Sequence, residues 1–324
     1  MQDIRKKISF FWFILVPLLF LIVINIRKII PQLNPKEYQR RDIVKEIYYE
    51  TQKNKKEKDN TWELKRVQSI GEDAPVIFGT NAILIDNNNG NILYEINSGE
   101  RRPIASLVKI MTAVVALEHK NLDDIIPVSP LAAGIGENSM GLSAGEKYTL
   151  RELMYGMMLN SGNDSASAIA EGVAGNIDNF VRWMNMKSDE LNLKDTHFSD
   201  PSGLNDSSYS TAADLAVLTN YALEYPEFRE IIKTIEMEIP YSENHKYIYL
   251  YNQTNLLTTY PGVAGVKTGY TEEAGLCLVT YVNNEDRELI GVVLNSTDRK
   301  GDMIQMLDYG YSLFDMKIEH HLLD

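Results

Sequence analysis

Strand patterns at both ends of the chain's body, separated by a long helical stretch, most constrain its fold. Two apolar runs flank an Asp-Asn-Asn-Asn-Gly turn and predict a β-hairpin over residues 82–96. Three further strand-like runs follow near the C-terminus, at 262–270, 276–282 and 288–294. Because strands must pair, we expect the two ends to meet in one sheet. The pattern predicts an α+β fold with a helical insertion.

Helical periodicity fills the intervening sequence. Residues 104–118 follow a helical pattern, and the signals from 149 to 225 are mostly helical. Thr149-Leu-Arg-Glu152 matches a capping box, and the Met-rich face after it predicts core packing. Residues 300–314 are expected to form a closing helix.

The N-terminus carries an apolar run from Ile8 to Ile26, bounded by basic residues on both sides. It is long enough to cross a bilayer as a helix. It exceeds a signal-peptide core and lacks a small-x-small cleavage site, so we expect an uncleaved signal anchor. We therefore expect three parts: residues 1–28 as the N-terminal tip and transmembrane anchor, 29–75 as a charged linker, and 76–324 as the folded body.

Composition excludes several functions. The net charge is -13, and the acidic excess lies after the first 75 residues. Such a body lacks the basic face that nucleic acids require, so no nucleic-acid partner is expected. The single cysteine, Cys277, excludes an internal disulfide and lies in an apolar run typical of a core residue. No His-Glu-x-x-His motif or Cys/His cluster indicates a metal site, and we expect neither metal nor organic cofactor.

The first motif with chemical potential is Ser106-Leu-Val-Lys109, the only Ser-x-x-Lys in the chain. Residues three apart share one face of a helix, so the hydroxyl and the amine can meet. A serine hydroxyl is a weak nucleophile that needs an adjacent base. Lysine can serve if nearby positive charge and partial burial lower its pKa. Taken alone, the motif favours the ordinary interpretation of a surface Ser and Lys.

The second motif is Ser161-Gly162-Asn163, between two helical runs. The ordinary interpretation is that Asn163 or Asp164 caps the following helix. The functional interpretation has Ser161 relaying a proton and Asn163 holding a substrate carbonyl beside Ser106.

The third motif is Lys267-Thr268-Gly269, at the end of a strand pattern. Lys267 and Thr268 would present a cation and a hydroxyl to a carboxylate. Gly269 would allow close approach of a substrate. The N–H of Tyr270 could complete an oxyanion hole with that of Ser106. Its ordinary interpretation is a strand end.

The three motifs together, in this order and on these elements, are stronger evidence for an active site than each motif alone. With Pro103–Ala113, Leu159–Asp164, Thr196–Leu204 and Gly265–Thr271, they make the chain resemble the serine D-Ala-D-Ala carboxypeptidases, the low-molecular-mass penicillin-binding proteins. The resemblance covers roughly residues 76–316.

The resemblance implies an antiparallel sheet flanked by helices, an all-helical lobe, and a site between the two. It implies acylation of Ser106 by peptidoglycan stem peptides ending in D-Ala-D-Ala, release of D-alanine, and hydrolysis. Lys109 would act as base, and β-lactam antibiotics would acylate the same serine. This chemistry places residues 76–324, the catalytic domain, outside the cell on a single-pass anchor in the cell membrane.

Two features depart from many members of that family. The chain ends soon after the last expected helix and carries its expected anchor at the N-terminus. Tyr270 also stands where some members have histidine.

Three alternatives remain open. Gly141-Leu-Ser143-Ala-Gly145 matches a nucleophile elbow but lacks the required preceding strand. A β-lactamase is the nearest enzymatic alternative, with Glu190-Leu-Asn192 resembling part of its loop, although Ser188 replaces the expected glutamate. The last is a penicillin-recognising sensor without turnover.

Overall fold

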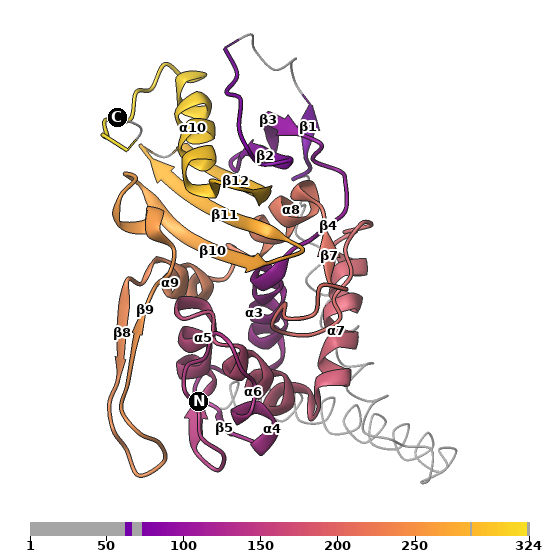
Figure 1. The fold of residues 1–324 in the computed structure, drawn as a ribbon, viewed down its shortest axis with the longest axis vertical. Coiled ribbons are helices and arrows are strands. Elements are labelled where there is room, and N and C mark those ends of the chain that lie inside the picture. The colour runs from indigo at the N-terminus through magenta and orange to yellow at the C-terminus, as the bar shows by residue number, and fades with distance from the viewer. Residues whose placement is uncertain (1–61, 67–72, 286, 323–324) are drawn as a thin grey trace, which may run out of the picture. The chain divides into compact units, whose positions relative to one another are not determined.

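A six-stranded sheet joins the two ends of the body, as the sequence predicts (Figure 1). The computed structural model describes residues 62–66, 73–285 and 287–322. Neighbouring strands follow the order β1-β3-β2-β12-β11-β10, all antiparallel except β1 with β3. The mixed fold of sheet and helices is confirmed. The strand bounds are β1 Lys65–Arg66, β2 Asn81–Asp86, β3 Asn91–Ile96, β10 Val263–Thr271, β11 Gly275–Asn284 and β12 Arg287–Ser296.

The sheet is covered on both faces because its central strands are apolar on both sides. In β2, Ile83 and Ile85 enter one core, while Ala82 and Leu84 enter the other. Alternate residues of a strand point to opposite faces, which explains this division. Helix α8 (Ala212–Ala222) packs on the first face and α10 (Arg299–Ser312) on the second.

The helical lobe lies between β3 and β10 in the chain and below the sheet in Figure 1. Its other helices are the 3-10 turn η2 Ala105–Leu107, α3 Val108–His119, α4 Pro130–Ala133, α5 Leu150–Leu159, α6 Asn163–Ala174, α7 Ile177–Glu190, α9 Pro226–Lys233 and the 3-10 turn η3 Asn255–Thr258. Short antiparallel pairs complete it: β4 Arg102–Pro103 with β7 Tyr209–Ser210, β5 Ile125–Pro127 with β6 Lys147–Thr149, and β8 Glu236–Ile239 with β9 Ile248–Tyr251.

Local sequence signals explain where helices begin. The Thr149 hydroxyl accepts the Glu152 N–H while the Glu152 carboxylate accepts the Thr149 N–H, so the expected capping box opens α5. The Met-rich face of α5 is buried as expected. The helix expected over 104–118 differs at its start: Pro103 pairs in β4, η2 follows, and regular α-helix begins only at Val108.

Residues 62–66, which fall inside the expected linker, belong to the folded unit. β1 pairs with β3, and the Trp62 indole donates a hydrogen bond to the Asn87 carbonyl at 3.0 Å. The expected anchor in residues 1–28 and most of the expected linker lie outside the described residues. Within the part of the chain that the structure describes, no helix has both the length and the apolar character needed to span a bilayer.

A buried ionic cluster joins α3, α7 and α8 at the C-terminal end of α3. The Lys187 ammonium lies 2.9 Å from the Glu118 carboxylate, and these side chains are 0% and 1% exposed. Glu190 contacts the same ammonium at 2.9 Å. The hydroxyls of Tyr221 and Tyr225 donate hydrogen bonds to Glu118, at 2.6 and 2.8 Å. The pair of Lys187 with Glu118 therefore ties α7 to α3, while Glu190 pairs with Lys187 within α7.

Replacing Glu118 with alanine should destabilise the fold by about 3 kcal/mol, because it leaves a buried ammonium with a weakened set of partners. Denaturant unfolding of the variant measures this difference. The double replacement Glu118→Leu with Lys187→Met removes both charges and should recover much of the loss. A single variant as stable as wild type would show that the cluster contributes nothing to folding.

Candidate active site

Ser106 lies in η2, where the chain turns from β4 into α3. The preceding residue, Ala105, has a φ of +47°, a left-handed conformation that is strained for a residue with a Cβ. Gly203 packs against this turn, since an added Cβ would lie 1.9 Å from the Ala105 carbonyl oxygen. The loop around Gly203 therefore fixes the peptide that precedes Ser106.

Lys109 lies one turn further, fully buried at the start of α3. Its Nζ donates to Ser106 Oγ at 2.9 Å, to Asn163 Oδ1 at 2.8 Å and to the Ser202 carbonyl at 2.6 Å. An ammonium has three N–H groups, so each finds one acceptor. These acceptors come from η2, α6 and the loop before β7, three segments far apart in the sequence.

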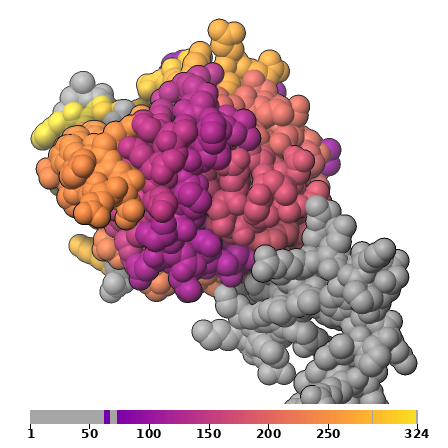
Figure 2. Space-filling model, turned by 90° about the horizontal axis from the view of Figure 1, so that it is seen from below, coloured from indigo at the N-terminus to yellow at the C-terminus, as the bar shows by residue number. Residues whose placement is uncertain are grey.

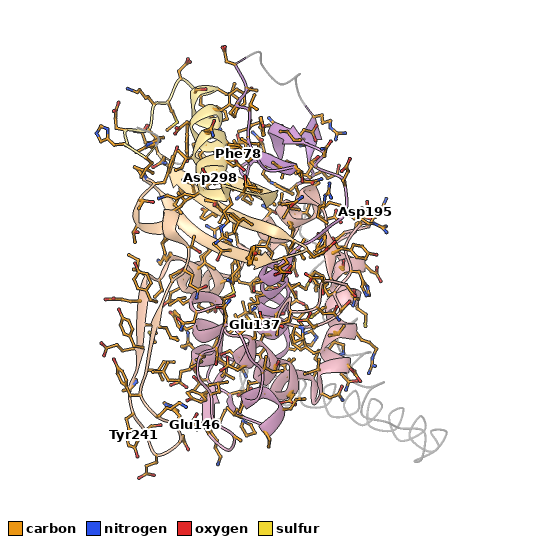
Figure 3. All side chains as sticks on the ribbon, in the orientation of Figure 1. Phe78, Glu137, Glu146, Asp195, Tyr241 and Asp298 are labelled. Carbon is orange, nitrogen blue, oxygen red and sulfur yellow. The ribbon has the colours of Figure 1, made fainter. Side chains whose placement is uncertain are left out.

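Burial lowers the pKa of Lys109 to about 7. The charged groups that oppose this shift are acidic: Asp200, Asp164 and Glu137. Burial therefore lowers the pKa of Lys109 against the opposing effect of these acidic groups. Loss of hydration alone brings the amine close to half-protonation at neutral pH. Glu137, labelled in Figure 3, belongs to the loop between α4 and β6.

Ser161 follows the end of α5, with its Oγ 3.1 Å from Ser106 Oγ. Its φ is +58°, and only 2% of its surface is exposed. Ser106 Oγ thus contacts one hydroxyl and one amine, which can exchange protons with it. The left-handed backbone at Ser161 turns the chain sharply between α5 and α6.

The capping interpretation of the second motif is wrong in detail. Gly162 occupies the cap position of α6 and makes no side-chain cap, while Asn163 is the first helical residue. The Asn163 amide oxygen accepts from Lys109 and its NH₂ donates to the Gly136 carbonyl at 3.3 Å. The Asp164 carboxylate accepts the N–H groups of residues 140–142, so it shapes the neighbouring loop instead.

The third motif lies on β10, the edge strand of the sheet. Lys267 and Thr268 are 1% and 5% exposed, and Lys267 Nζ donates to the Thr268 carbonyl at 3.0 Å. Burial, then the positive charges of Lys109 and Arg299, hold the pKa of Lys267 well below its usual range. An anionic ligand beside Lys267 would oppose these effects and raise its pKa again.

Gly269 brings β10 against Ser106. An added Cβ there would lie 3.0 Å from the Ser106 amide nitrogen and 3.1 Å from the Ile104 carbonyl oxygen. The absence of a side chain thus permits the approach that joins the first and third motifs. Tyr270 follows with its side chain 61% exposed. All three motifs meet around Ser106, and the roles assigned to their residues stay predictions.

Sequence reasoning missed two contributors. Arg299, the first residue of α10, donates through Nη1 to the carbonyls of Gly269 at 2.7 Å and Cys277 at 3.2 Å. Asp200 accepts the N–H groups of Ser202 and other loop residues, which holds the Ser202 carbonyl against Lys109. In the sequence, the segment Thr196–Leu204 contributes to the family resemblance but predicts no role for Asp200. Arg299 belongs to none of the three motifs.

The residues of the rival interpretations lie elsewhere. Ser143 is in an exposed loop, where its hydroxyl accepts from Lys246 at 2.8 Å. Glu190 belongs to the buried cluster at the opposite end of α3 from Lys109. Asn192, with a φ of +57°, follows α7 in the left-handed conformation expected of a helix end. Cys277 is fully buried in the sheet, and burial raises the pKa of its thiol to about 11.

Comparison with known proteins agrees with this geometry. A family model described as D-alanyl-D-alanine carboxypeptidase matches residues 68–298. D-alanyl-D-alanine carboxypeptidase DacF of Bacillus subtilis is 34% identical over 260 residues, which cover 78% of this chain and 65% of that protein. A D-alanyl-D-alanine carboxypeptidase of Streptomyces sp. K15 is 32% identical over 259 residues, covering 74% and 89%.

Among solved structures, the Streptomyces K15 DD-transpeptidase matches with a TM-score of 0.70 and 32% identity, covering 74% of this chain and 99% of that one. The chain spans less than two thirds of the length of the Bacillus relative. The sequence match, the shared fold and the convergent motifs lead to one conclusion: the chain belongs to the D-alanyl-D-alanine carboxypeptidase family of serine peptidases.

Proposed function

We propose that this protein is a penicillin-binding serine carboxypeptidase that removes the terminal D-alanine from D-Ala-D-Ala stem peptides of peptidoglycan. The observation that carries the proposal is the contact of Ser106 Oγ with both Lys109 Nζ and Ser161 Oγ, at 2.9 and 3.1 Å. A hydroxyl so placed has a base and a proton relay within reach.

In the acylation step, Ser106 Oγ attacks the carbonyl carbon of the penultimate D-Ala. Neutral Lys109 takes the hydroxyl proton, which is feasible because burial lowers its pKa to about 7. The peptide C–N bond then breaks, and the proton reaches the leaving nitrogen through Ser161, so D-alanine departs as a neutral amine. Water attacks the resulting ester, and the same groups return the proton to Ser106.

The remaining site residues bind the peptide. Lys267 and Thr268 receive the terminal carboxylate, with Arg299 adding positive charge beside β10. Asn163 positions a substrate carbonyl. The N–H groups of Ser106 and Tyr270 stabilise the oxyanion across the narrow gap left by Gly269. β-Lactam antibiotics acylate Ser106 in place of the peptide, and the reaction requires no metal or organic cofactor.

Replacing Ser106 with alanine should lower D-alanine release from a D-Ala-D-Ala peptide by at least about a thousandfold, because the acyl-enzyme can no longer form. Release is followed by a coupled D-amino acid oxidase assay on the full-length protein in detergent. Ser143→Ala, which removes the exposed serine of the rival motif, is the matched control and should retain activity. Equal activity in wild type and Ser106→Ala, or inertness of both while folded, contradicts the proposal.

Penicillin treatment separates the alternatives in the same preparation. Intact mass and peptide mapping should locate one adduct on the peptide containing Ser106. Rapid loss of the adduct with multiple turnovers would indicate a β-lactamase. A stable adduct without any release of D-alanine would indicate a sensor.

The acylation rate should rise with pH through about 7 and then level off. The sign follows from the base: a lysine with a lowered pKa is inactive while protonated below that pH and becomes active as it loses its proton. The rate of acylation by a fluorescent penicillin, measured at several values between about pH 5 and pH 9, gives the profile. Lys109→Arg stays protonated throughout that range and should be inactive. A flat wild-type profile would exclude Lys109 as the base.

We propose further that residues 8–26 anchor the protein in the cell membrane with the catalytic domain outside. The apolar length of this run and the extracytoplasmic location of peptidoglycan support the proposal. Protease added to intact wall-stripped cells should digest the body, and the full-length protein should stay with the membrane fraction after a high-salt wash. Release into the soluble fraction, or protection from protease until lysis, would contradict it.

A further inference from the structure

Exposed tyrosines line the outer face of the β8–β9 hairpin, which the catalytic steps do not use. Tyr247, Tyr249 and Tyr251 are 51%, 49% and 52% exposed, while the intervening Ile248 and Leu250 are buried. Successive side chains in a strand point to opposite faces, so the three tyrosines share one face. We call these three residues the tyrosine stripe.

The stripe stands on a projecting part of the molecule. Figure 2 shows the hairpin, in orange, standing out from the side of the helical lobe. Tyr241, which is 77% exposed, lies near the free end of the same hairpin (Figure 3). About half of the surface of each tyrosine in the stripe remains in water in the folded state and is open to a ligand.

Carboxylates accompany the rings on the same face. Glu236 and Glu238 of β8 are exposed and lie directly opposite Tyr251 and Tyr249. The Tyr249 hydroxyl donates to Glu236 at 2.5 Å. The stripe therefore offers flat apolar rings beside acceptors for hydroxyl and amide donors. Its negative charge disfavours partners rich in phosphate, such as nucleic acids or anionic membranes.

The C-terminal end of β9 contacts the segment that leads to Ser161. The Tyr251 N–H donates to the Asn160 side-chain oxygen at 3.0 Å, and the Gln253 N–H donates to the Leu159 carbonyl at 3.1 Å. Asn160 directly precedes Ser161, which contacts the nucleophile. The backbone of Tyr251, at one end of the stripe, therefore contacts the residue that precedes Ser161 in the chain.

We propose that the tyrosine stripe binds the sugar strand of peptidoglycan, a polymer of N-acetylated hexosamines to which the stem peptides are attached. This inference rests on the proposed function and extends it from the peptide to the polymer. A pyranose ring presents a C–H face that packs on tyrosine rings, and its hydroxyl and N-acetyl groups donate to the neighbouring carboxylates. Tyrosine supplies such contact area at low conformational cost.

Binding a remote part of the substrate favours the attached peptide over a free one. Glycan-linked stem peptides should therefore have a higher kcat/KM than short peptides with the same D-Ala-D-Ala end. The test compares both substrates with the full-length protein. The double variant Tyr247→Thr with Tyr249→Thr removes two rings and places a β-branched residue in β9 and another just before it.

We expect the double variant to lose about tenfold in kcat/KM on the glycan-linked substrate and to keep the wild-type rate on the short peptide. Its affinity for a soluble β-1,4-linked N-acetylglucosamine hexamer, measured by calorimetry, should fall by a similar factor. Tyr247→Phe with Tyr249→Phe keeps the rings and should retain most of the kcat/KM on the glycan-linked substrate and most of the affinity for the hexamer. Phe78→Ser, at an exposed aromatic residue at the other end of the body in Figure 3, is the matched control and should change neither.

Several results would overturn the inference. One is an equal kcat/KM of wild type on the two substrates, and another is hexamer binding that the double threonine variant retains. The inference would also be refuted if the double threonine variant lost binding to a protein partner or to anionic vesicles while its binding of the hexamer was unchanged. Failure of wild type to release D-alanine from the short peptide would instead refute the proposed function, whereas hexamer binding tests the stripe by itself.

Discussion

The burial of the Lys109 amine is the constraint on which the site depends. Its three N–H groups reach η2, α6 and the loop before β7, so one side chain holds three distant segments in register. Burial also brings its pKa to about 7, which makes proton transfer from Ser106 accessible near neutral pH. The same loss of hydration therefore serves both assembly and chemistry.

The sheet forms the opposite wall of the site, where the backbone of β10 lies close to the backbone of Ser106. Gly269 lets β10 approach the Ser106 amide, and Arg299 ties the strand to α10 through two carbonyls. Lys267 is held buried with a depressed pKa, so a substrate carboxylate would restore a charge that the free protein disfavours. Binding of the anion and protonation of Lys267 are thus linked.

The β8–β9 hairpin is the part of the helical lobe that we propose binds the polymer to which the peptide is attached. The β8–β9 hairpin buries Ile248 and Leu250 inward and leaves the tyrosine stripe outward. Its strand β9 ends against Asn160, next to Ser161, the residue proposed to relay the proton. A polymer bound along the hairpin and a peptide bound at β10 would form two parts of one substrate.

The sequence by itself determined the strands at the two ends of the body, the helical stretch between them, the capping box that opens α5, and the three motifs, because these depend on local pattern and spacing. It did not predict the short strand pairs β4–β7, β5–β6 and β8–β9. Only the tertiary structure decided that Gly162 precedes α6, that Asp164 holds a loop, and that Arg299 lies beside Gly269. Those facts depend on which segments pack together across long stretches of chain, and no local pattern records such contacts.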